Sequence, residues 1–342
     1  MNLDFSEEQQ VLRDTVRKLC AEYSPVSVVR AMEDDPKGVP DVLWKQLAEL
    51  GLLGVLVPEE YGGSAQTLLE AVIVFEELGR ALAPTPAFES AVMSANVLLA
   101  AGSDAQKKEW LPKIASGESI LTPAWLEPQS GFGPQGVKLR ATKSGDGYVL
   151  TGQKRHVSFA SSAARLVVLA RTGDKTEDVS LFLVDPHAQG VSMKQLKSLA
   201  SDTQYDVRFD SVRVPAAARL GAENGGWKVW DAAMHDGIIV LAGLAMGGCE
   251  RALEITVQYA KDRKQFDKPI GAFQAISHYL ADAVTQLDGG KTLAYEAAAA
   301  RAQGRDIRRL APMAKLFASE TLQTVSRMGM QSGRLPPDRW PW

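Results

Sequence analysis

The stretch that decides the fold is Tyr259-Ala-Lys-Asp-Arg-Lys-Gln-Phe-Asp-Lys-Pro-Ile-Gly-Ala-Phe-Gln274. It lies between residues 238–259 and residues 276–287, where apolar side chains recur every three or four positions. That spacing indicates two amphipathic helices. Pro269 and Gly271 interrupt the pattern between them, and both residue types favour turns over continued helix. The sequence therefore predicts a helical hairpin with a short turn at its tip.

The cations at this tip have two interpretations. Arg263 and Lys264 stand where the first helix ends, and positive side chains at a helix C-terminus complement the helix dipole. On this view they form an ordinary solvated helix end, which residue chemistry alone favours. The alternative is an anion site, because a planar guanidinium pairs well with pyrophosphate.

The order of residues supports the second interpretation. Tyr-x-x-x-Arg-x-x-Phe-x-x-Pro-Ile-x-x-Phe-Gln resembles the signature of acyl-CoA dehydrogenases, flavoenzymes that oxidise acyl-CoA thioesters at the α,β position. In that family the Arg and the Gln cross a dimer interface to the FAD of the neighbouring subunit. The resemblance implies cofactor-binding roles for Arg263, Phe266 and Gln274. The family has Gly where this chain has Asp267, and Asp adopts left-handed backbone angles less readily than Gly.

Composition limits the other classes of function. The chain has 342 residues, of which 45% are hydrophobic, so it can bury a substantial core. A net charge of −3 gives no reason to expect a nucleic-acid partner. We expect no membrane span, because no run of about 18 apolar residues is present, and no secretory signal, so we expect a cytoplasmic protein. Cys20 and Cys249 lie on apolar helical faces and are predicted to be separate buried thiols, with no metal site.

The predicted fold class is α+β, mostly α. Residues 1–120 have helical periodicity, and residues 121–222 contain short β-rich runs separated by turns, which predict a small barrel or sandwich. Residues 223–331 are helical again, with helices expected at 238–262, 273–288, 291–301 and 310–328. This order resembles the family's N-terminal α-helical domain, middle β-barrel domain and C-terminal helical bundle, here truncated, with residues 332–342 as a tail unlike the family.

Two features of the first 120 residues are predicted from the residues themselves. The apolar run 51–63 is stopped by one Pro and two Gly, so it is expected to be a tight loop rather than a strand. Glu76 and Glu77 fall within a helix and are expected to be solvated charges.

Two segments would face the flavin if the resemblance holds. In the first, Trp125-Leu-Glu-Pro128 resembles the family's Thr-Glu-Pro, whose Thr hydrogen-bonds the flavin ring. Leu126 stands at the Thr position and has no side-chain donor, whereas Ser130 in the following loop offers a hydroxyl. The resemblance therefore implies flavin contacts for Trp125, Leu126 and Ser130.

The second segment is Lys154-Arg-His-Val-Ser-Phe-Ala160, which resembles the family's Lys-x-Trp-Ile-Thr/Ser-Asn. Ser158 matches the hydroxyl that reaches flavin N5, and His156 stands where a Trp covers the ring. A His on a strand is more often a packed or surface residue than a catalytic one. As a flat aromatic ring it can still cover the flavin.

The reaction of the family requires a carboxylate that removes the α-proton and donors that stabilise the developing enolate. In one subgroup this Glu stands 26 residues before the signature Arg, which here is Gly237. The neighbouring Asp236 is the predicted base, offset by about 100° around the helix. In the other subgroup the Glu lies in a C-terminal loop that this chain does not reach.

The last seven residues, Pro336-Pro-Asp-Arg-Trp-Pro-Trp342, contain three prolines and two tryptophans and cannot form a helix. A frameshift or premature end is one hypothesis for this ending, and a natural short paralogue is the other.

The resemblance implies FAD-dependent α,β-dehydrogenation of an acyl-CoA to the trans-2-enoyl-CoA in lipid catabolism. An electron-transferring flavoprotein would be the acceptor, and the assembly a homo- or heterotetramer. One alternative is an FAD-binding subunit without its own base, paired with a paralogous subunit. The other is an inactive truncated paralogue.

Overall fold

The computed structural model describes residues 5–128 and 130–332. The chain divides into two compact units. The helical unit comprises Met1–Val29, Gln66–Ala83 and His235–Trp342. The mixed unit comprises Arg30–Ala65 and Pro84–Met234. The predicted ending at residues 332–342 lies almost wholly outside the described residues.

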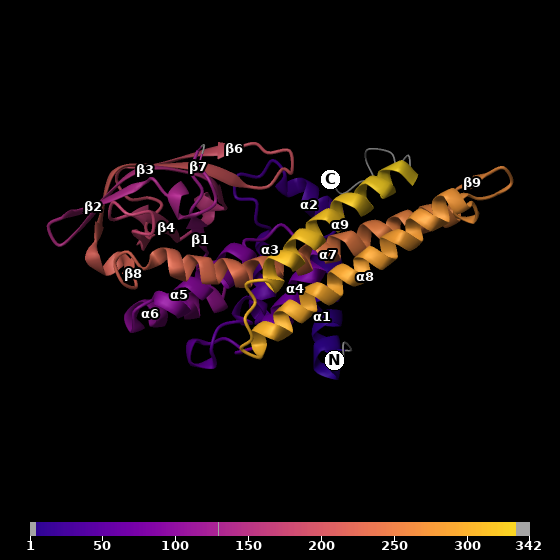
Figure 1. Cartoon of the computed structure of the whole chain (residues 1–342), viewed down its shortest axis with the longest axis horizontal. Coiled ribbons are helices and arrows are strands. Elements are labelled where there is room, and N and C mark those ends of the chain that lie inside the picture. Colours follow the sequence, from indigo (N-terminus) through magenta and orange to yellow (C-terminus); the bar gives the residue numbers. More distant parts are fainter. Residues whose placement is uncertain (1–4, 129, 333–342) are drawn as a thin grey trace. The chain divides into compact units, whose positions relative to one another are not determined.

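The helical unit is built from long helices (Figure 1), which are α1 (Glu7–Tyr23), α4 (Leu68–Arg80), most of α7 (Gly226–Asp262), α8 (Gln274–Ala302) and α9 (Leu310–Ser332). Local chemistry sets where they begin. Ser6 and Gln9 form a capping box at the start of α1, and Thr67 and Glu70 form another at α4. Each box satisfies backbone N–H groups that have no partner inside the helix.

The predicted helices 273–288 and 291–301 are one continuous helix, α8, and α7 begins at Gly226 instead of residue 238. The pair Gly289-Gly290 does not end α8, and the second of them, Gly290, packs closely on Met246 of α7. A Cβ on Gly290 would lie 2.3 Å from the Met246 sulfur. The intrinsic cost of glycine in a helix, about 1 kcal/mol, is thus offset by close packing of α8 on α7.

The prediction that Glu76 and Glu77 are solvated is wrong, since each is only 1% exposed. Glu76 accepts a hydrogen bond from the Tyr295 hydroxyl and lies 2.8 Å from the Lys291 ammonium. Glu77 binds the Arg17 guanidinium through both oxygens, at 2.7 and 2.8 Å. Buried carboxylates need such partners, so these residues are structural elements of the core.

Glycines allow α4 and α7 to touch backbone to backbone. A Cβ on Gly247 would lie 1.7 Å from the Glu76 carbonyl oxygen, and one on Gly79 would lie 2.0 Å from the Leu244 carbonyl oxygen. No side chain fits in either place, because real Cβ contacts are never this short.

The mixed unit joins short helices to a sheet. Its helices include α3 (Asp41–Glu49), α5 (Ala95–Ala101) and α6 (Asp104–Ala115), and α2 (Val26–Met32) runs between the two units in sequence. The predicted loop 51–63 contains single 3₁₀ turns at Leu52–Gly54 and Glu59–Tyr61 and no strand, as expected. Before α5 the helix widens into a π-helix over Phe88–Ser94.

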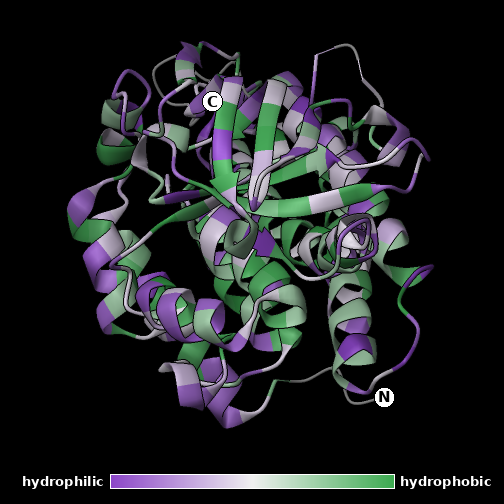
Figure 2. Cartoon of the chain, turned by 90° about the vertical axis from the view of Figure 1, so that its left-hand side faces the viewer, coloured by the Kyte–Doolittle hydropathy of each residue, from purple (hydrophilic) through white to green (hydrophobic). Residues whose placement is uncertain are grey.

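The sheet has eight strands, with β1 (Leu121–Ala124) pairing β4 beside the path β6-β7-β3-β2-β4-β5-β8. The strands are β2 (Arg140–Ser144), β3 (Gly147–Ser158), β4 (Arg165–Arg171), β5 (Val179–Val184), β6 (Val191–Leu196), β7 (Gln204–Pro215) and β8 (Arg219–Leu220). Almost all of β4 and β5 is buried, whereas β7 alternates along much of its length. Figure 2 shows apolar and polar residues following each other along strands of the sheet. A β region between helical segments confirms the predicted fold class.

Both cysteines are buried and unpaired, as predicted. Removal from water raises the pKa of each thiol, Cys20 and Cys249, to about 12. Among the residues that the structure describes, no helix has the length and apolar character needed to cross a membrane.

Candidate flavin site

The end of β3 is distorted around Ser158. The register of β3 against β7 shifts between Lys154 and Val157, and within this bulge His156 has φ +54°. Phe159, directly after Ser158, has φ +52°. Left-handed backbone in a non-glycine residue costs roughly 1–3 kcal/mol and persists where surrounding contacts enforce it, often at functional sites. Two such residues therefore hold Ser158 between them.

The surrounding contacts are visible for each of these residues. The Ser158 carbonyl accepts a hydrogen bond from the Thr122 hydroxyl at 2.7 Å, and the Phe159 N–H donates to the Thr203 carbonyl at 3.0 Å. The Ser158 side chain lies beside the Glu89 carboxyl and acts to lower its pKa. The position of Ser158 is thus set from three other segments of the mixed unit.

Glu89 lies in the π-helix, a feature often found at functional sites. The Ser94 hydroxyl donates to the Glu89 carbonyl across five residues, at 2.8 Å. Burial raises the pKa of the Glu89 carboxyl to about 7, and the negative charge of Asp202 acts in the same direction, while the Ser158 hydroxyl opposes them. Near neutral pH this carboxyl can therefore be either protonated or ionised.

The protonation state of Glu89 decides what Ser158 can offer. A serine hydroxyl has one proton to donate, and an ionised carboxylate can only accept. When Glu89 is ionised, the Ser158 hydroxyl can donate its proton to the carboxylate. When Glu89 is protonated, it can donate to Ser158, whose own proton is then available to a third group.

The His156 ring is held by hydrogen bonds that involve Gln204, the first residue of β7, and Asp202 in the loop before it. Its Nδ1 is hydrogen-bonded to Oε1 of Gln204. The Gln204 amide nitrogen lies 3.0 Å from both carboxylate oxygens of Asp202. The ring itself is exposed, so its direction is set by these hydrogen bonds.

The Trp125–Ser130 segment follows β1 and is tied to β3, since the Arg155 N–H donates to the Leu126 carbonyl at 2.9 Å. The Trp125 ring packs on the buried Trp230, with centroids 5.4 Å apart. The Ser130 hydroxyl donates to the Pro128 carbonyl at 3.3 Å, a local contact within the loop. This segment supplies a flat aromatic surface beside the end of β3.

An ion pair buried beneath these residues fixes the same loop. The Lys154 ammonium lies 2.7 Å from Glu127 Oε1, and that oxygen also accepts from the backbone N–H groups of Lys138 and Leu139 at 3.0 Å. Desolvation lowers the pKa of Lys154 to about 8, against the pull of Glu127. Glu127 is thus committed to holding the loop that carries Trp125.

In the helical unit, the predicted hairpin tip is a two-stranded ribbon of β9 (Lys264–Gln265) and β10 (Lys268–Pro269). The two residues between the strands, Phe266 and Asp267, have φ +53° and +64°, as in type I′ turns. Asp267 thus adopts the left-handed conformation for which the family's Gly is better suited.

The tip residues are exposed to solvent, although the Phe266 ring packs edge-on against Phe273. Arg263 and Gln274 are exposed, and the Phe266 side chain is 87% exposed. Within the described part of the chain, the Arg263 guanidinium makes no hydrogen bond or ion pair. The tip thus offers an unpaired cation, an aromatic ring and an amide together.

Asp236, the predicted base, is paired with Arg301. The two carboxylate oxygens lie 2.6 and 3.1 Å from the guanidinium nitrogens, and Asp236 is only 9% exposed. The carboxylate raises the pKa of Arg301. Asp236 lies about 40 Å from Arg263 along α7, at 1.5 Å per residue, so the chain does not bring these two residues together.

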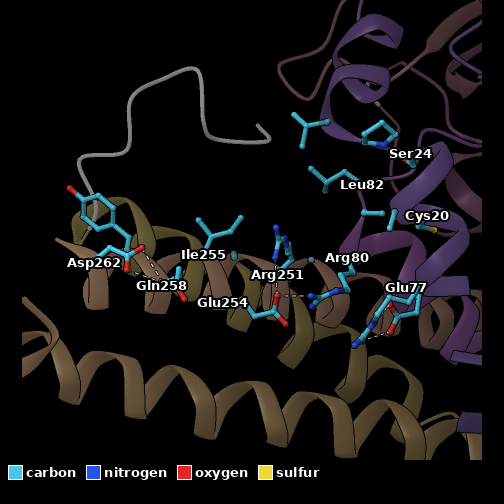
Figure 3. A pocket seen from close by; sticks show the side chains of 18 residues that line it. Cys20, Ser24, Glu77, Arg80, Leu82, Arg251, Glu254, Ile255, Gln258 and Asp262 are labelled. Carbon is cyan, nitrogen blue, oxygen red and sulfur yellow. Dashed lines mark hydrogen bonds and ion pairs between the residues drawn. The ribbon is translucent and has the colours of Figure 1, made fainter. Parts of the chain in front are cut away.

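The helical unit also contains a pocket of about 960 Å³ between α1, α4 and the second half of α7 (Figure 3). Several of its polar side chains pair with one another, as Arg80 does with Glu254 and Gln258 with Asp262. None of the predicted site residues lines it.

Sequence reasoning missed the polar residues behind the site, which are Glu89, Asp202 and Gln204. One signal was present: Glu89 is the only charge in the otherwise apolar or small stretch Phe88-Glu-Ser-Ala-Val-Met-Ser94. Asp202 and Gln204 had no comparable signal, because their role depends on the path of the loop before β7.

The residues present fit a flavin dinucleotide. In the mixed unit, Ser158 offers a hydroxyl, and Trp125 and His156 offer flat rings. In the helical unit, Arg263 offers a guanidinium that has no partner among the described residues and is suited to pyrophosphate.

Comparison with known proteins gives the family. The family models described as acyl-CoA dehydrogenase N-terminal, middle and C-terminal domains match residues 6–118, 123–212 and 224–332. The chain belongs to the acyl-CoA dehydrogenase family, and its cofactor is FAD.

Three similar proteins illustrate the range of the family. The probable acyl-CoA dehydrogenase YngJ of Bacillus subtilis (strain 168) is 33% identical over 97% of this chain and 89% of its own length. The caffeyl-CoA reductase-Etf complex subunit CarC of Acetobacterium woodii is 30% identical over 96% of this chain and 88% of its own. In the structure of the ChsE4-ChsE5 complex from Mycobacterium tuberculosis, the matching chain has a TM-score of 0.87 at 28% identity, covering 97% of this chain and 88% of that one.

Proposed function

We propose that this chain removes two hydrogens from the α,β bond of an acyl-CoA thioester and forms the trans-2-enoyl-CoA. The observation that supports the proposal is the strained segment His156–Phe159, which holds Ser158, the residue that matches in sequence the family's serine or threonine next to flavin N5. Bound FAD would take up the two electrons from the substrate, before they pass to an external acceptor. The residues of this chain bind it and orient it.

The mixed unit would hold the flavin ring. Ser158 donates a hydrogen bond to it, while Trp125, Leu126 and His156 cover it, and Ser130 lies in the adjoining loop. Trp125 is suited to this task because its ring is braced by the buried Trp230. Braced aromatic rings lose little freedom when they bind a flat ligand.

The hairpin tip would bind the FAD of a second subunit. Arg263 pairs with its pyrophosphate, and Phe266 and Gln274 contact the same cofactor. Their exposure and the unpaired guanidinium favour this role. Exposed apolar side chains on α8 and α9, among them Tyr279, Leu316 and Phe317, favour association with another copy or a paralogous subunit.

The electron acceptor we propose is an electron-transferring flavoprotein. The similarity to a subunit of a complex with such a flavoprotein supports it.

For the base we propose Asp236, held by Arg301. The Arg301 guanidinium binds both carboxylate oxygens, so Asp236 has to give up part of this ion pair to take up a proton. Proton abstraction by Asp236 would therefore need a substrate whose α-proton is made acidic, as it is when donors polarise the thioester carbonyl.

A second candidate is a subunit that takes its base from a partner chain. The observation that favours it is the same ion pair, because a carboxylate bound through both oxygens is poorly placed to accept a proton. The similarity to a chain of a two-protein complex agrees with this candidate.

Flavin absorbance tests the site. The purified chain should show a bound-flavin band, and Arg263→Gln should lose most of it, because the pyrophosphate contact disappears. Arg308→Gln, at an exposed position outside the tip, is the matched control. Equal flavin content in both variants would contradict the role of the tip.

Turnover then separates the two candidates. With a set of acyl-CoAs, Asp236→Asn should abolish activity of the chain alone, while Asp262→Asn on the same helix should not. If the chain is inactive alone but active with a paralogous subunit, and Asp236→Asn leaves that activity unchanged, the second candidate is correct.

A further inference from the structure

The direction of the hydrogen bonds at His156 follows from the chemistry of its neighbours. Asp202, as a carboxylate, can only accept hydrogen bonds, and it contacts one end of the Gln204 amide through both oxygens at 3.0 Å. That end of the amide must be the NH₂ group. The other end, which contacts His156, must be the carbonyl oxygen.

A carbonyl oxygen needs a donor. The Nδ1 atom of His156 must therefore carry a proton where it contacts Gln204. In a neutral imidazole only one nitrogen carries a proton, so Nε2 has its lone pair free. The hydrogen bond that Nδ1 makes thus decides which nitrogen is protonated, as it does in other histidine sites.

The direction of the His156 ring is also set by its backbone conformation. His156 lies in the bulge of β3 with φ +54°, whereas an ordinary strand residue would need no such strain. Gln204 is buried at the start of β7 and cannot easily leave. A further contact holds Asp202, which accepts a hydrogen bond from the Ser198 hydroxyl.

The other charged groups around the ring are paired or face elsewhere. On β3, Lys154 is paired with Glu127, and Arg155 lies 3.6 Å from Asp206 of β7. From the π-helix, Glu89 lies beside Ser158. Asp202 is thus the negative charge connected to His156, through Gln204.

We propose that Gln204 and Asp202 are positioning residues that hold His156 as the Nδ1–H tautomer, so that Nε2 is the atom that gains and loses a proton next to the bound flavin, and that this proton changes the cofactor's reduction potential. The inference rests on the proposed function, since it requires FAD beside β3. A protonated ring adds a positive charge, which favours electron uptake by its neighbour. The Trp of the family cannot do this.

The first test needs no cofactor. The chain has four histidines, so a ¹⁵N-histidine NMR spectrum is simple, and His156→Asn identifies the signal. We expect the Nδ1–H tautomer in the unmodified protein. Gln204→Leu, which removes the acceptor, should convert most of it to the Nε2–H form. Ser198→Ala, which leaves both Gln204 contacts in place, should not.

The second test measures the reduction potential of bound FAD against pH. Over the pH range in which the reduced protein carries the proton on His156 and the oxidised protein does not, the ratio of reduced to oxidised flavin depends more steeply on pH. The ratio should change up to tenfold more per pH unit than it does in a protein without this histidine. For a two-electron couple this is about 30 mV. His156→Asn and His156→Trp should lose this component, and Ser198→Ala should keep it.

The outcomes separate the two proposals. An Nε2–H tautomer in the unmodified protein, or a potential whose pH dependence is the same in His156→Asn, overturns this inference while FAD binding stands. A chain with the expected tautomer that binds no FAD contradicts the proposed function and, with it, the role of the ring.

Discussion

Replacing Glu89 with Gln should stabilise the protein at high pH and leave it unchanged at low pH. Burial raises the pKa of this carboxyl from 4.5 to about 7 in the folded chain. Between these values the folded chain keeps a proton that the unfolded chain has released, so stability falls as pH rises through this window. Above pH 7 the ionised group costs up to about 3 kcal/mol, from 1.36 kcal/mol per pKa unit.

Gln has the shape of Glu, can donate to Ser158 and does not ionise. Urea unfolding of both proteins at about pH 4, below the unfolded pKa, and at about pH 8 tests this prediction. Glu89→Gln should match the unmodified protein at the lower pH and exceed it by up to about 3 kcal/mol at the higher one. Glu59→Gln, at an exposed site, is the control. The same difference at both pH values would refute the reasoning.

Three further predictions concern the structural features described above. Lys154→Met should destabilise the protein by about 3–5 kcal/mol, because Glu127 is left buried without its cation; a double variant with Glu127→Gln that unfolds no later in urea than the single one would contradict this. Gly247→Ala should cost at least about 3 kcal/mol through the clash with the Glu76 carbonyl, whereas Gly289→Ala, whose nearest neighbours lie at 3.5 Å, should be neutral or gain up to about 1 kcal/mol; equal melting temperatures would exclude close α4–α7 packing. Asp267→Gly should relieve the left-handed turn and add up to about 1 kcal/mol, and Asp267→Val should lower the melting temperature; the opposite order would show that the turn carries no strain.

The fold could be predicted from the sequence where a pattern is local. The hairpin at 259–274 was predictable from the apolar periodicity on either side of Pro269 and Gly271. The turn at 51–63 was predictable from its glycines and proline. The continuity of α8 could not be predicted, because Gly289-Gly290 weakens a helix locally and only contact with Met246 explains it. Propensity gave way there to tertiary packing.

The candidate site divides in the same way. His156, Ser158 and Arg263 lie in short sequence motifs that resemble those of the family. Their partners Glu89, Asp202 and Gln204 come from segments far from them in the chain. For Glu76 and Glu77 the expectation failed because charge alone suggests solvent, whereas Lys291, Tyr295 and Arg17 reach them from other helices.

The contact of Lys291 and Tyr295 with Glu76 has a consequence for how the helical unit selects one arrangement. The buried face of α8 is rich in alanine, including Ala294, Ala297 and Ala298, and so smooth a surface would lose little by sliding one turn, about 5.4 Å, along its neighbours. Lys291 and Tyr295 are themselves one turn apart and converge on a single carboxylate. Any slip would leave a buried ammonium or carboxylate without its partner, at a cost of several kcal/mol. Glu76, Lys291 and Tyr295 thus select one register of α8, whereas apolar contacts alone would allow several.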